Sequence, residues 1–415
     1  MKLDFGYGKG IQSVHVAEKH VLKQLLPLCT ETTVSEHDEI ERALSEPLGC
    51  PVIERLFKPG EKVAVVISDI TRPMPSYKVL ISIIDRLNKA GIPDNDITVV
   101  SALGSHRHQT QEELVRLAGE ECYKRVRVVD SDPDDCIRFG VTSRGTPVDI
   151  TRIVAKADRR ICVGNVEFHY FAGFSGGYKA IMPGCSTPGA IQSNHRLMTE
   201  AGAYAGNIDT NPLREDIDEA GRMTGVDFIL NVVLDEHKKI VKAFAGDPVI
   251  AHREACDHLR KMFGVPIEKR ADIVICSQGG APKDLNLYQT QKALDNAKHA
   301  VKDGGVIILV GACQEGLGGS VFENWMRSAA SPDELISRIR ENFVLGGHKA
   351  AAIAMVLKKA EIFMVSEMDP KLVKSIFLKP YSTLSGAYRA AQKKFGGRGT
   401  VITMPYGGST LPITE

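Results

Sequence analysis

The segment GFSGGYK at residues 173–179 combines three glycines with a lysine, and this combination suggests a ligand site. Glycine lets backbone N–H groups approach an anion, so the segment could cradle a phosphate. It lacks the Gly-Lys-Ser/Thr ending of a P-loop. Lys179 could instead bind a cofactor covalently, which requires a buried and deprotonated amine. The third interpretation is a surface turn with a solvated lysine, which the apolar and aromatic flanks at 168–174 and 181–183 disfavour.

Four of the twelve histidines lie in or beside polar segments that could form a site: His106, His108, His169 and His195. A pair of histidines can accept and return a substrate proton at neutral pH. The alternation of His106 and His108 could also indicate a metal pair on a strand, although carboxylates at matching spacing are missing. His195 could ligate a transition metal through one imidazole nitrogen, or it could lie on the surface of a helix.

Three further side chains are candidates for binding a substrate carboxylate or hydroxyl. Arg72, within DITRP at 69–73, carries a planar guanidinium that can bind two oxygens at once, and its alternative role is a structural ion pair. Gln289 and Lys292 are three residues apart in an expected helix, so both can project from one helical face. They could reach a substrate across a cleft or form part of a solvated helix surface.

The elements that must position these residues follow the rhythm of an α/β protein, with short β-branched runs between amphipathic segments. Ligands in open α/β sheets bind beyond the carboxyl ends of the strands, so polar segments at those ends are expected to converge. Strands are expected at 63–69, 96–103 and 159–166, and the polar segments that follow them are 69–73, 104–108 and 167–169. A helix is expected over Tyr77–Ala90, closed by Gly91.

The length of 415 residues exceeds what one hydrophobic core usually supports, so two domains are expected. A second α/β rhythm begins near Ala271, and the linker is expected around Pro266–Arg270. In this second part, strands are expected at 273–277, 306–310, 362–365 and 400–404, and helices at 289–302, 333–342 and 382–394.

Composition excludes several classes of function. The net charge is +1 and no Lys/Arg-rich block stands out, so neither nucleic acid nor an anionic membrane surface is expected as a partner. No apolar run reaches the length of about 18 residues that a membrane-spanning helix needs. The N-terminus lacks the layout of a signal peptide, and the nine cysteines form no CxxC pair. These features predict a cytoplasmic protein that acts on a small molecule.

Taken in order, the candidate residues resemble the nickel-pincer lactate racemase family, which comprises racemases and epimerases of 2-hydroxy acids. The resemblance extends over almost the whole chain. Lys179 follows His169 by ten residues and precedes His195 by sixteen, and this spacing matches the family. The residues that carry the resemblance are Asp69, Thr71, Arg72, His106, His169, Lys179, His195, Gln289 and Lys292.

The resemblance implies an isomerase that uses a nickel-pincer nucleotide, Ni(II)-pyridinium-3,5-bisthiocarboxylate mononucleotide. It implies that Lys179 holds this cofactor covalently, that His195 ligates the nickel, and that cofactor biosynthesis proteins load it. It makes His106 and His169 the two acid/base residues. The loop that contacts cofactor and substrate would comprise Asp69, Ile70, Thr71 and Arg72, and Gln289 and Lys292 would bind substrate from the second domain together with Arg72.

The resemblance also implies the domain arrangement: two α/β domains with the cofactor and substrate cleft between them. The first domain is expected to comprise residues 1–268 and a C-terminal segment, 391–415, that returns to it. The second domain is expected at 269–390.

In the implied mechanism, hydride leaves the Cα atom of the 2-hydroxy acid while a histidine takes the hydroxyl proton. The planar 2-keto acid can then be reduced on either face. A 2-hydroxy-acid dehydrogenase, with or without NAD, is the rival enzyme, although no G-x-G-x-x-G follows an early strand. A non-enzymatic α/β protein that binds a small molecule is the other alternative. Which 2-hydroxy acid is the substrate and what His108 does are left open.

Overall fold

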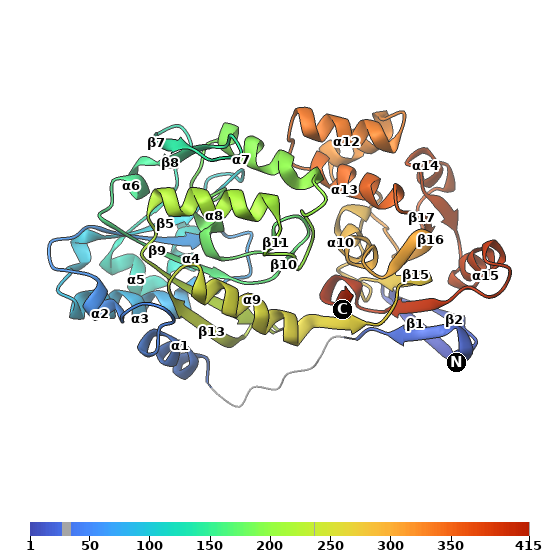
Figure 1. Ribbon diagram of the computed structural model, residues 1–415, viewed down its shortest axis with the longest axis horizontal. Coiled ribbons are helices and arrows are strands. Elements are labelled where there is room, and N and C mark those ends of the chain that lie inside the picture. The colour runs from blue at the N-terminus through green and yellow to red at the C-terminus, as the bar shows by residue number, and fades with distance from the viewer. Residues whose placement is uncertain (27–34, 236, 415) are drawn as a thin grey trace. The chain divides into compact units, whose positions relative to one another are not determined.

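The computed structural model describes residues 1–26, 35–235 and 237–414, and the chain divides into two compact units (Figure 1). Unit 1 comprises Met1–Cys29 and Lys261–Glu415, and unit 2 comprises Thr30–Arg260. Within the described residues, each unit contains a six-stranded, mainly parallel sheet with helices packed against it. The expected architecture of two α/β domains is therefore confirmed.

The sheet of unit 2 has five parallel strands and one antiparallel edge strand, β13, which pairs with β12. In spatial order the strands are β13 (Ile240–Gly246), β12 (Phe228–Leu234), β9 (Arg159–Asn165), β4 (Val63–Ser68), β5 (Ile97–Ala102) and β6 (Arg127–Asp130). Two short antiparallel pairs accompany the sheet: β7 (Cys136–Val141) with β8 (Pro147–Thr151), and β10 (Phe168–His169) with β11 (Gly173–Phe174).

Helices of unit 2 bury their apolar faces against the β-branched side chains of this sheet. One core cluster joins Val65 of β4 and Val99 of β5 with Ile83 of α3. The helix α3 begins and ends within one residue of its expected bounds, and Gly91 follows it with φ 87°. The helices are α1 (Glu36–Ser45), α2 (Ile53–Leu56), α3 (Ser76–Lys89), α4 (Gln111–Ala118), α5 (Glu120–Arg125), α6 (Arg152–Ala155), α7 (Pro188–His195), α8 (Pro212–Thr224) and α9 (Ile250–Phe263), with 3-10 turns η2 (Asp94–Asp96), η3 (Gly177–Ala180) and η4 (Arg196–Thr199).

The sheet of unit 1 is entirely parallel. In spatial order its strands are β18 (Lys379–Tyr381), β17 (Ala360–Val365), β16 (Val301–Val310), β15 (Ala271–Ser277), β19 (Val401–Met404) and β3 (Val21–Gln24). Two further pairs belong to this unit: the antiparallel hairpin of β1 (Lys2–Tyr7) and β2 (Gly10–His15), and the parallel pair of β14 (Gly264–Ile267) and β20 (Leu411–Thr414).

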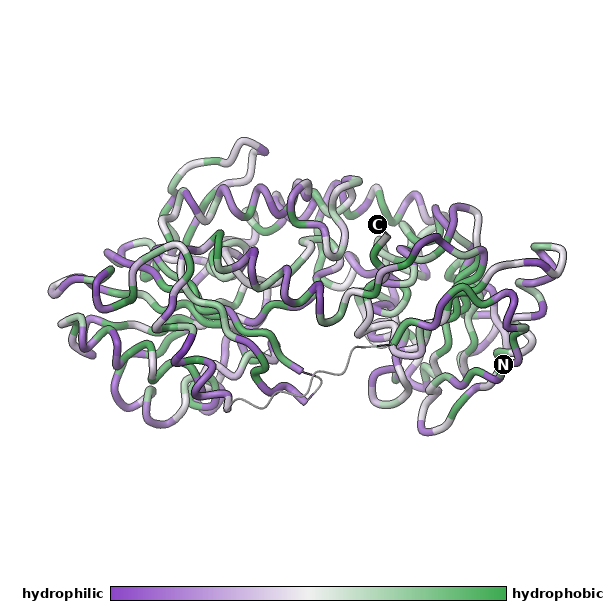
Figure 2. Tube along the Cα trace, turned by 60° about the horizontal axis from the view of Figure 1, so that its bottom comes forward, coloured by the Kyte–Doolittle hydropathy of each residue, from purple (hydrophilic) through white to green (hydrophobic). Residues whose placement is uncertain are grey.

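Alternating side chains of the unit 1 strands form two separate cores. Ile307 and Leu309 of β16 pack with α10, α11, α12 and α13, whereas Ile308 and Val310 pack with α15 and the β1–β2 hairpin. In Figure 2 the strands at the centre of each unit are predominantly hydrophobic. The helices of this unit are α10 (Leu287–Ala297), α11 (Ser320–Ser328), α12 (Pro332–Glu341), α13 (Gly347–Leu357), α14 (Pro370–Ser375) and α15 (Leu384–Lys394), with 3-10 turns η1 (Glu18–His20) and η5 (Gly407–Ser409).

The chain segments are distributed between the two units differently from the sequence-based expectation. Residues 391–415 were expected to return to the first domain, but this prediction is wrong, because β19 hydrogen-bonds to β15 and β3 and β20 pairs with β14, all within unit 1. The expected domain bounds of 1–268 and 269–390 are also wrong, because the N-terminal strands β1, β2 and β3 belong to unit 1 as well. The helix expected over 289–302 ends at Ala297, and β16 already begins at Val301.

None of the helices in the described residues is long and apolar enough to cross a membrane.

Candidate active site

Loops that follow neighbouring parallel strands of unit 2 meet at the carboxyl edge of the sheet. The Asp69 loop follows β4 and the His106 loop follows β5, and β4 and β5 are paired. The carboxylate atom Oδ2 of Asp69 lies 2.9 Å from Nδ1 of His106. Thr71 donates its hydroxyl to Oδ1 of Asp69 over 3.0 Å and lies 3.3 Å from the same His106 nitrogen. The predicted convergence of these two loops is therefore confirmed.

The carboxylate of Asp69 fixes the orientation of His106. Asp69 is only 2% exposed, and burial by itself would raise its pKa. The hydrogen bond and charge of His106 and the hydrogen bond of Thr71 outweigh burial, so that the pKa of Asp69 lies below 3.8. An ionised carboxylate only accepts hydrogen bonds, so Nδ1 of His106 carries the proton and its Nε2 is the basic nitrogen.

His169 lies on the short strand β10, directly beyond β9, and is kept neutral by its surroundings. Its Nδ1 atom accepts a hydrogen bond of 3.2 Å from the backbone N–H of Ala172, so the ring proton is on Nε2. Burial lowers the pKa of His169 well below 6.5, and nearby cationic groups, Arg72 among them, lower it further. Arg72, the residue expected to bind a carboxylate, therefore lies within electrostatic reach of this histidine.

The ring of Phe171 gathers three of the predicted site residues. Its centroid lies 4.5 Å from that of His169 and 5.1 Å from that of His195, both in edge-to-face geometry. The amine of Lys179 lies 5.8 Å from the same centroid. The structure thus brings together residues 169, 179 and 195, which the sequence separates by up to 26 positions.

The amine of Lys179 has a strongly reduced affinity for protons. Burial lowers its pKa well below 10.5, and the positive charges of Arg214 and Arg72 add to this effect. A lowered pKa is one property that a covalently reactive lysine needs, but the Lys179 side chain is half-buried and its covalent role stays a prediction.

A set of polar side chains that sequence reasoning missed holds the loop before Lys179. Arg214 is fully buried in α8 and donates to the carbonyl groups of Ala172, Phe174 and Gly176. Two more side chains donate to carbonyl groups of the loop: Nδ2 of Asn211 donates to Phe171 (2.9 Å) and Nε2 of His252 donates to Ser175 (2.8 Å). In addition, Oδ1 of Asn231 accepts the backbone N–H of Gly177 (2.9 Å). No local pattern identifies these residues, since they pack against a loop that lies 38 to 77 residues away in the sequence.

The glycines of this loop are required by its geometry. Gly173, Gly176 and Gly177 have φ values of 74°, 76° and 60°, which side chains disfavour. A Cβ atom on Gly176 would lie 2.7 Å from Oδ1 of Asn231, and one on Gly177 would lie 2.8 Å from the His252 ring. The glycines therefore let the backbone approach its clamping side chains.

His195 is held at the end of α7. The residue is 8% exposed, and its Nδ1 atom lies 3.1 Å from Oδ1 of Asn194. Asn194 is itself fully buried and donates to Asp216 over 2.7 Å. This chain of contacts fixes the imidazole ring, as expected for a ligand that must present one nitrogen.

Gln289 and Lys292 lie in the first turns of α10 in unit 1. Both are exposed, and Oδ1 of the N-cap residue Asn286 accepts the backbone N–H of Gln289 over 3.0 Å. Beneath them, the buried Lys349 of α13 donates to the carbonyl of Tyr288 over 2.7 Å. Their contact with a substrate remains a prediction.

Two sequence profiles match this chain: that of the lactate racemase N-terminal domain at residues 7–206, and that of the lactate racemase C-terminal domain at residues 267–411. The lactate racemase of Lactiplantibacillus plantarum is 31% identical, and the alignment covers 98% of each chain. This chain belongs to the lactate racemase family. It is an isomerase of the racemase class.

A second lactate racemase and two solved structures are also similar to this chain. The lactate racemase of Thermoanaerobacterium thermosaccharolyticum is 32% identical over 92% of this chain and 91% of the relative. The solved structure of the lactate racemase apoprotein from that organism is similar with a TM-score of 0.87, at 30% identity and over 100% of both chains. A Thermotoga maritima protein of 18% identity shares the fold with a TM-score of 0.63, over 93% of this chain and 100% of that one.

The residues around Lys179 fit the cofactor implied by the resemblance to nickel-pincer lactate racemases. Lys179, whose pKa is lowered, would supply the amine for a covalent link. The ordered imidazole of His195 is a ligand type that nickel accepts.

His108 contacts a different carboxylate from the one that orients His106. Its Nδ1 atom lies 3.2 Å from Oδ2 of Asp130, and its side chain is 69% exposed. Within the described part of the chain, no group of three or more His, Cys, Asp or Glu side chains is arranged to hold a metal ion.

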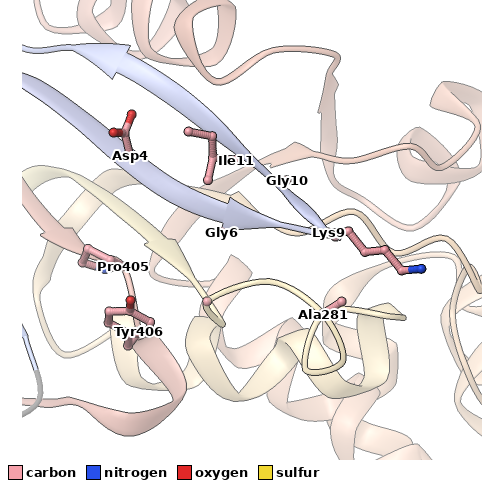
Figure 3. A pocket seen from close by; sticks show the side chains of 10 residues that line it. Asp4, Gly6, Lys9, Gly10, Ile11, Ala281, Pro405 and Tyr406 are labelled. Atoms are coloured by element: carbon pink, nitrogen blue, oxygen red, sulfur yellow. The ribbon is translucent and has the colours of Figure 1, made fainter.

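A cavity of about 550 Å³ lies in unit 1, beside the β1–β2 hairpin. Figure 3 shows Pro405 and Tyr406 on one side of it and Lys9, in the hairpin turn, on another. None of the predicted site residues lines this cavity.

Proposed function

We propose that this protein interconverts the enantiomers of lactate or a closely related 2-hydroxy acid, using a nickel-pincer nucleotide held by Lys179 and His195. The observation that carries the proposal is the arrangement of His169, Lys179 and His195 around Phe171, in the same unit as the Asp69–His106 pair. Membership of the lactate racemase family supports the reaction, since relatives about 31% identical over nearly the full length are lactate racemases.

The side chains of unit 2 can perform the binding and proton-transfer parts of this reaction. Arg72 would bind the substrate carboxylate through its planar guanidinium. The Nε2 atom of His106 is basic and can take the hydroxyl proton of the bound 2-hydroxy acid. His169, the second proposed acid/base residue, presents Nε2–H and can hydrogen-bond the oxygen of the same hydroxyl.

The bound cofactor would supply an acceptor for the Cα hydrogen as hydride, so that no carbanion has to form beside the carboxylate. The approach to the cofactor would be lined by the loop of Asp69, Ile70, Thr71 and Arg72. Gln289 and Lys292 would bind the substrate from unit 1. Loading would depend on cofactor biosynthesis proteins, and we place the reaction in the cytoplasm. The eight cysteines among the described residues are free thiols, which supports a reducing compartment.

The proposal is tested with protein produced alongside the cofactor biosynthesis proteins. Chiral chromatography should detect conversion of L-lactate to D-lactate and the reverse. Lactate deuterated at Cα should racemise in ordinary water and keep its label, because hydride returns to the same carbon. Loss of the label to solvent at the rate of racemisation would overturn hydride transfer and indicate a carbanion.

Nickel content and intact mass separate the parts of the proposal. Lys179→Ala should give a folded protein without the covalent adduct, because one loop side chain rarely sustains a core. His195→Ala should lower nickel occupancy. NADH binding without nickel would support the dehydrogenase instead.

A further inference from the structure

Arg214 is an unusual residue because it is charged, large and completely buried. It lies in the first turn of α8, three residues after the clamping residue Asn211. Its acidic neighbour Asp218 lies 3.6 Å away and also binds Arg253, so the guanidinium charge is only partly neutralised. A buried charge is costly unless its hydrogen bonds are satisfied, and here backbone carbonyl groups satisfy them.

The carbonyl groups that Arg214 binds belong to the loop that leads to Lys179. They alternate along the chain, at Ala172 (3.3 Å), Phe174 and Gly176 (3.5 Å). A guanidinium presents five N–H donors in a planar fork and can bind several carbonyl oxygens at once, whereas an ammonium is a compact point charge. The fork therefore determines the path of this loop.

The same guanidinium contributes to the charge environment of Lys179. Arg214 is the first of the two positive charges that lower the pKa of Lys179, after burial itself, and the second is Arg72. The charged and titratable groups around the amine are Arg72 after β4, His169 on β10, Arg214 on α8 and His252 on α9. The pKa values of both histidines are lowered well below 6.5, so the two arginines are the permanent charges of this group.

We propose that Arg214 is a positioning residue, whose guanidinium fixes the loop from Phe171 to Gly177 and thereby places the side chain of Lys179, which follows that loop. The use of that amine to hold a cofactor rests on the proposed function. The placement of the amine does not, because it is a property of the apoprotein.

The test measures the reactivity of Lys179 in the apoprotein. Trace acetylation with acetic anhydride is performed between pH 6 and pH 10, and peptide mass spectrometry gives the labelling of Lys179 relative to Lys124, whose side chain is 75% exposed. The labelling midpoint of a lysine is the pH at which its acetylation is half-maximal. In the wild type, the labelling midpoint of Lys179 should lie at a pH well below that of Lys124. Arg214→Gln should raise the Lys179 midpoint by about one pH unit, which is a roughly tenfold loss of neutral amine at neutral pH.

Arg160 offers a matched control. It is also a buried arginine of unit 2, 8% exposed, and its guanidinium binds the carbonyl groups of Val154, Ala155, Ala157 and Gly225. Arg160→Gln should lower the melting temperature but leave the labelling midpoint of Lys179 unchanged. If Arg214→Gln and Arg160→Gln shifted the labelling midpoint of Lys179 equally, loss of packing would explain the shift and the proposal would be overturned.

Two further variants keep the proposal open to refutation if Arg214→Gln does not fold. Asp218→Asn removes the carboxylate that partly neutralises Arg214, so the midpoint of Lys179 should fall further. Arg214→Lys retains the charge without the fork, so the midpoint should stay low while amide hydrogen exchange in residues 171–177 becomes faster. A midpoint that rises or stays constant in Asp218→Asn would contradict the assigned role.

Discussion

At the scale of single residues, His106 and His169 carry their ring protons on different nitrogens. Asp69 accepts from Nδ1 of His106, which leaves Nε2 basic. The backbone N–H of Ala172 donates to Nδ1 of His169, which leaves Nε2 as the donor. The two proposed acid/base residues therefore differ before substrate binds, and the carboxylate of Asp69 is the group that makes His106 the ready base.

We expect Asp69→Asn to lower kcat by about 10²–10⁴-fold, because an amide can stabilise the wrong tautomer of His106. Steady-state kinetics in both directions, with nickel content measured in parallel, would check this. Asp130→Asn is the control, since Asp130 pairs with the exposed His108 in the same way. Near-normal kcat in Asp69→Asn at full nickel occupancy would show that the orientation of His106 by Asp69 does not matter.

At the scale of elements, the sequence predicted the parts of the site that depend on local pattern. Runs of β-branched residues predict the strands β4, β5 and β9. A polar segment that carries Asp69, His106 or His169 comes after each of these runs, so the site loops could be predicted as well. The clamps at Arg214, Asn231 and His252 could not be predicted, because each acts on a loop 38 to 77 residues away. Whether an arginine is buried depends on tertiary packing, which the local sequence does not record.

The glycine-rich loop gives a prediction about its backbone. Gly176→Ala should destabilise unit 2 by about 1–3 kcal/mol, because φ of 76° is strained for alanine and its Cβ atom would meet Asn231. Gly189→Ala in α7 is the control, since a Cβ atom there meets nothing within 4 Å and alanine favours helix. Denaturant unfolding of the apoprotein measures the free energy of unfolding of Gly176→Ala and of Gly189→Ala. Equal stability of the two variants would contradict the required positive φ at Gly176.

The contact between α10 and α13 includes the buried Lys349, and burial disfavours the charged form of its amine. Burial and the charge of Lys292 lower the pKa of Lys349 to about 7, although Asp295 opposes this. The unfolded chain therefore binds more protons between about pH 7 and the usual value of 10.5, and the free energy of unfolding rises with pH in that window.

Lys349→Met should remove this pH dependence, which amounts to about 1.4 kcal/mol per pH unit. It also removes the hydrogen bond to Tyr288, so amide exchange in the first turn of α10 should become faster. Denaturant unfolding at pH 7, 8 and 9 tests the slope, with Lys371→Met at an exposed position of α14 as the control. The expectation fails if the free energy of unfolding changes equally with pH in the wild type and in Lys349→Met.

At the scale of the whole molecule, both termini contribute strands to unit 1. The strand β3 near the N-terminus pairs with β19 near the C-terminus, and their residues are about 380 positions apart. Hydrophobic patterns predict that a strand exists but do not identify its distant partner, so the predicted division at residue 268 assigned the first strands to the wrong domain.

The two units share a sensitivity to acid, because each encloses histidines that are neutral in the folded state. Burial lowers the pKa of His169 and His252 in unit 2, and of His299 in unit 1, well below 6.5. It lowers the pKa of His348 in unit 1 to about 4. Below the usual value of 6.5 the unfolded chain binds protons that the folded chain does not, so the free energy of unfolding falls as the pH falls.

The melting temperature of the apoprotein should therefore decrease steadily from pH 7 to pH 5, and each of these histidines should contribute about 1.4 kcal/mol per pH unit. His252 is the best residue for the test, because it is 1% exposed and glutamine can still donate to the carbonyl of Ser175. His252→Gln should flatten the pH dependence of unit 2 in scanning calorimetry, whereas His15→Gln at an exposed position should not. If His252→Gln loses stability as steeply as the wild type on acidification, proton uptake by the unfolded chain at this histidine is not a cause of the acid sensitivity.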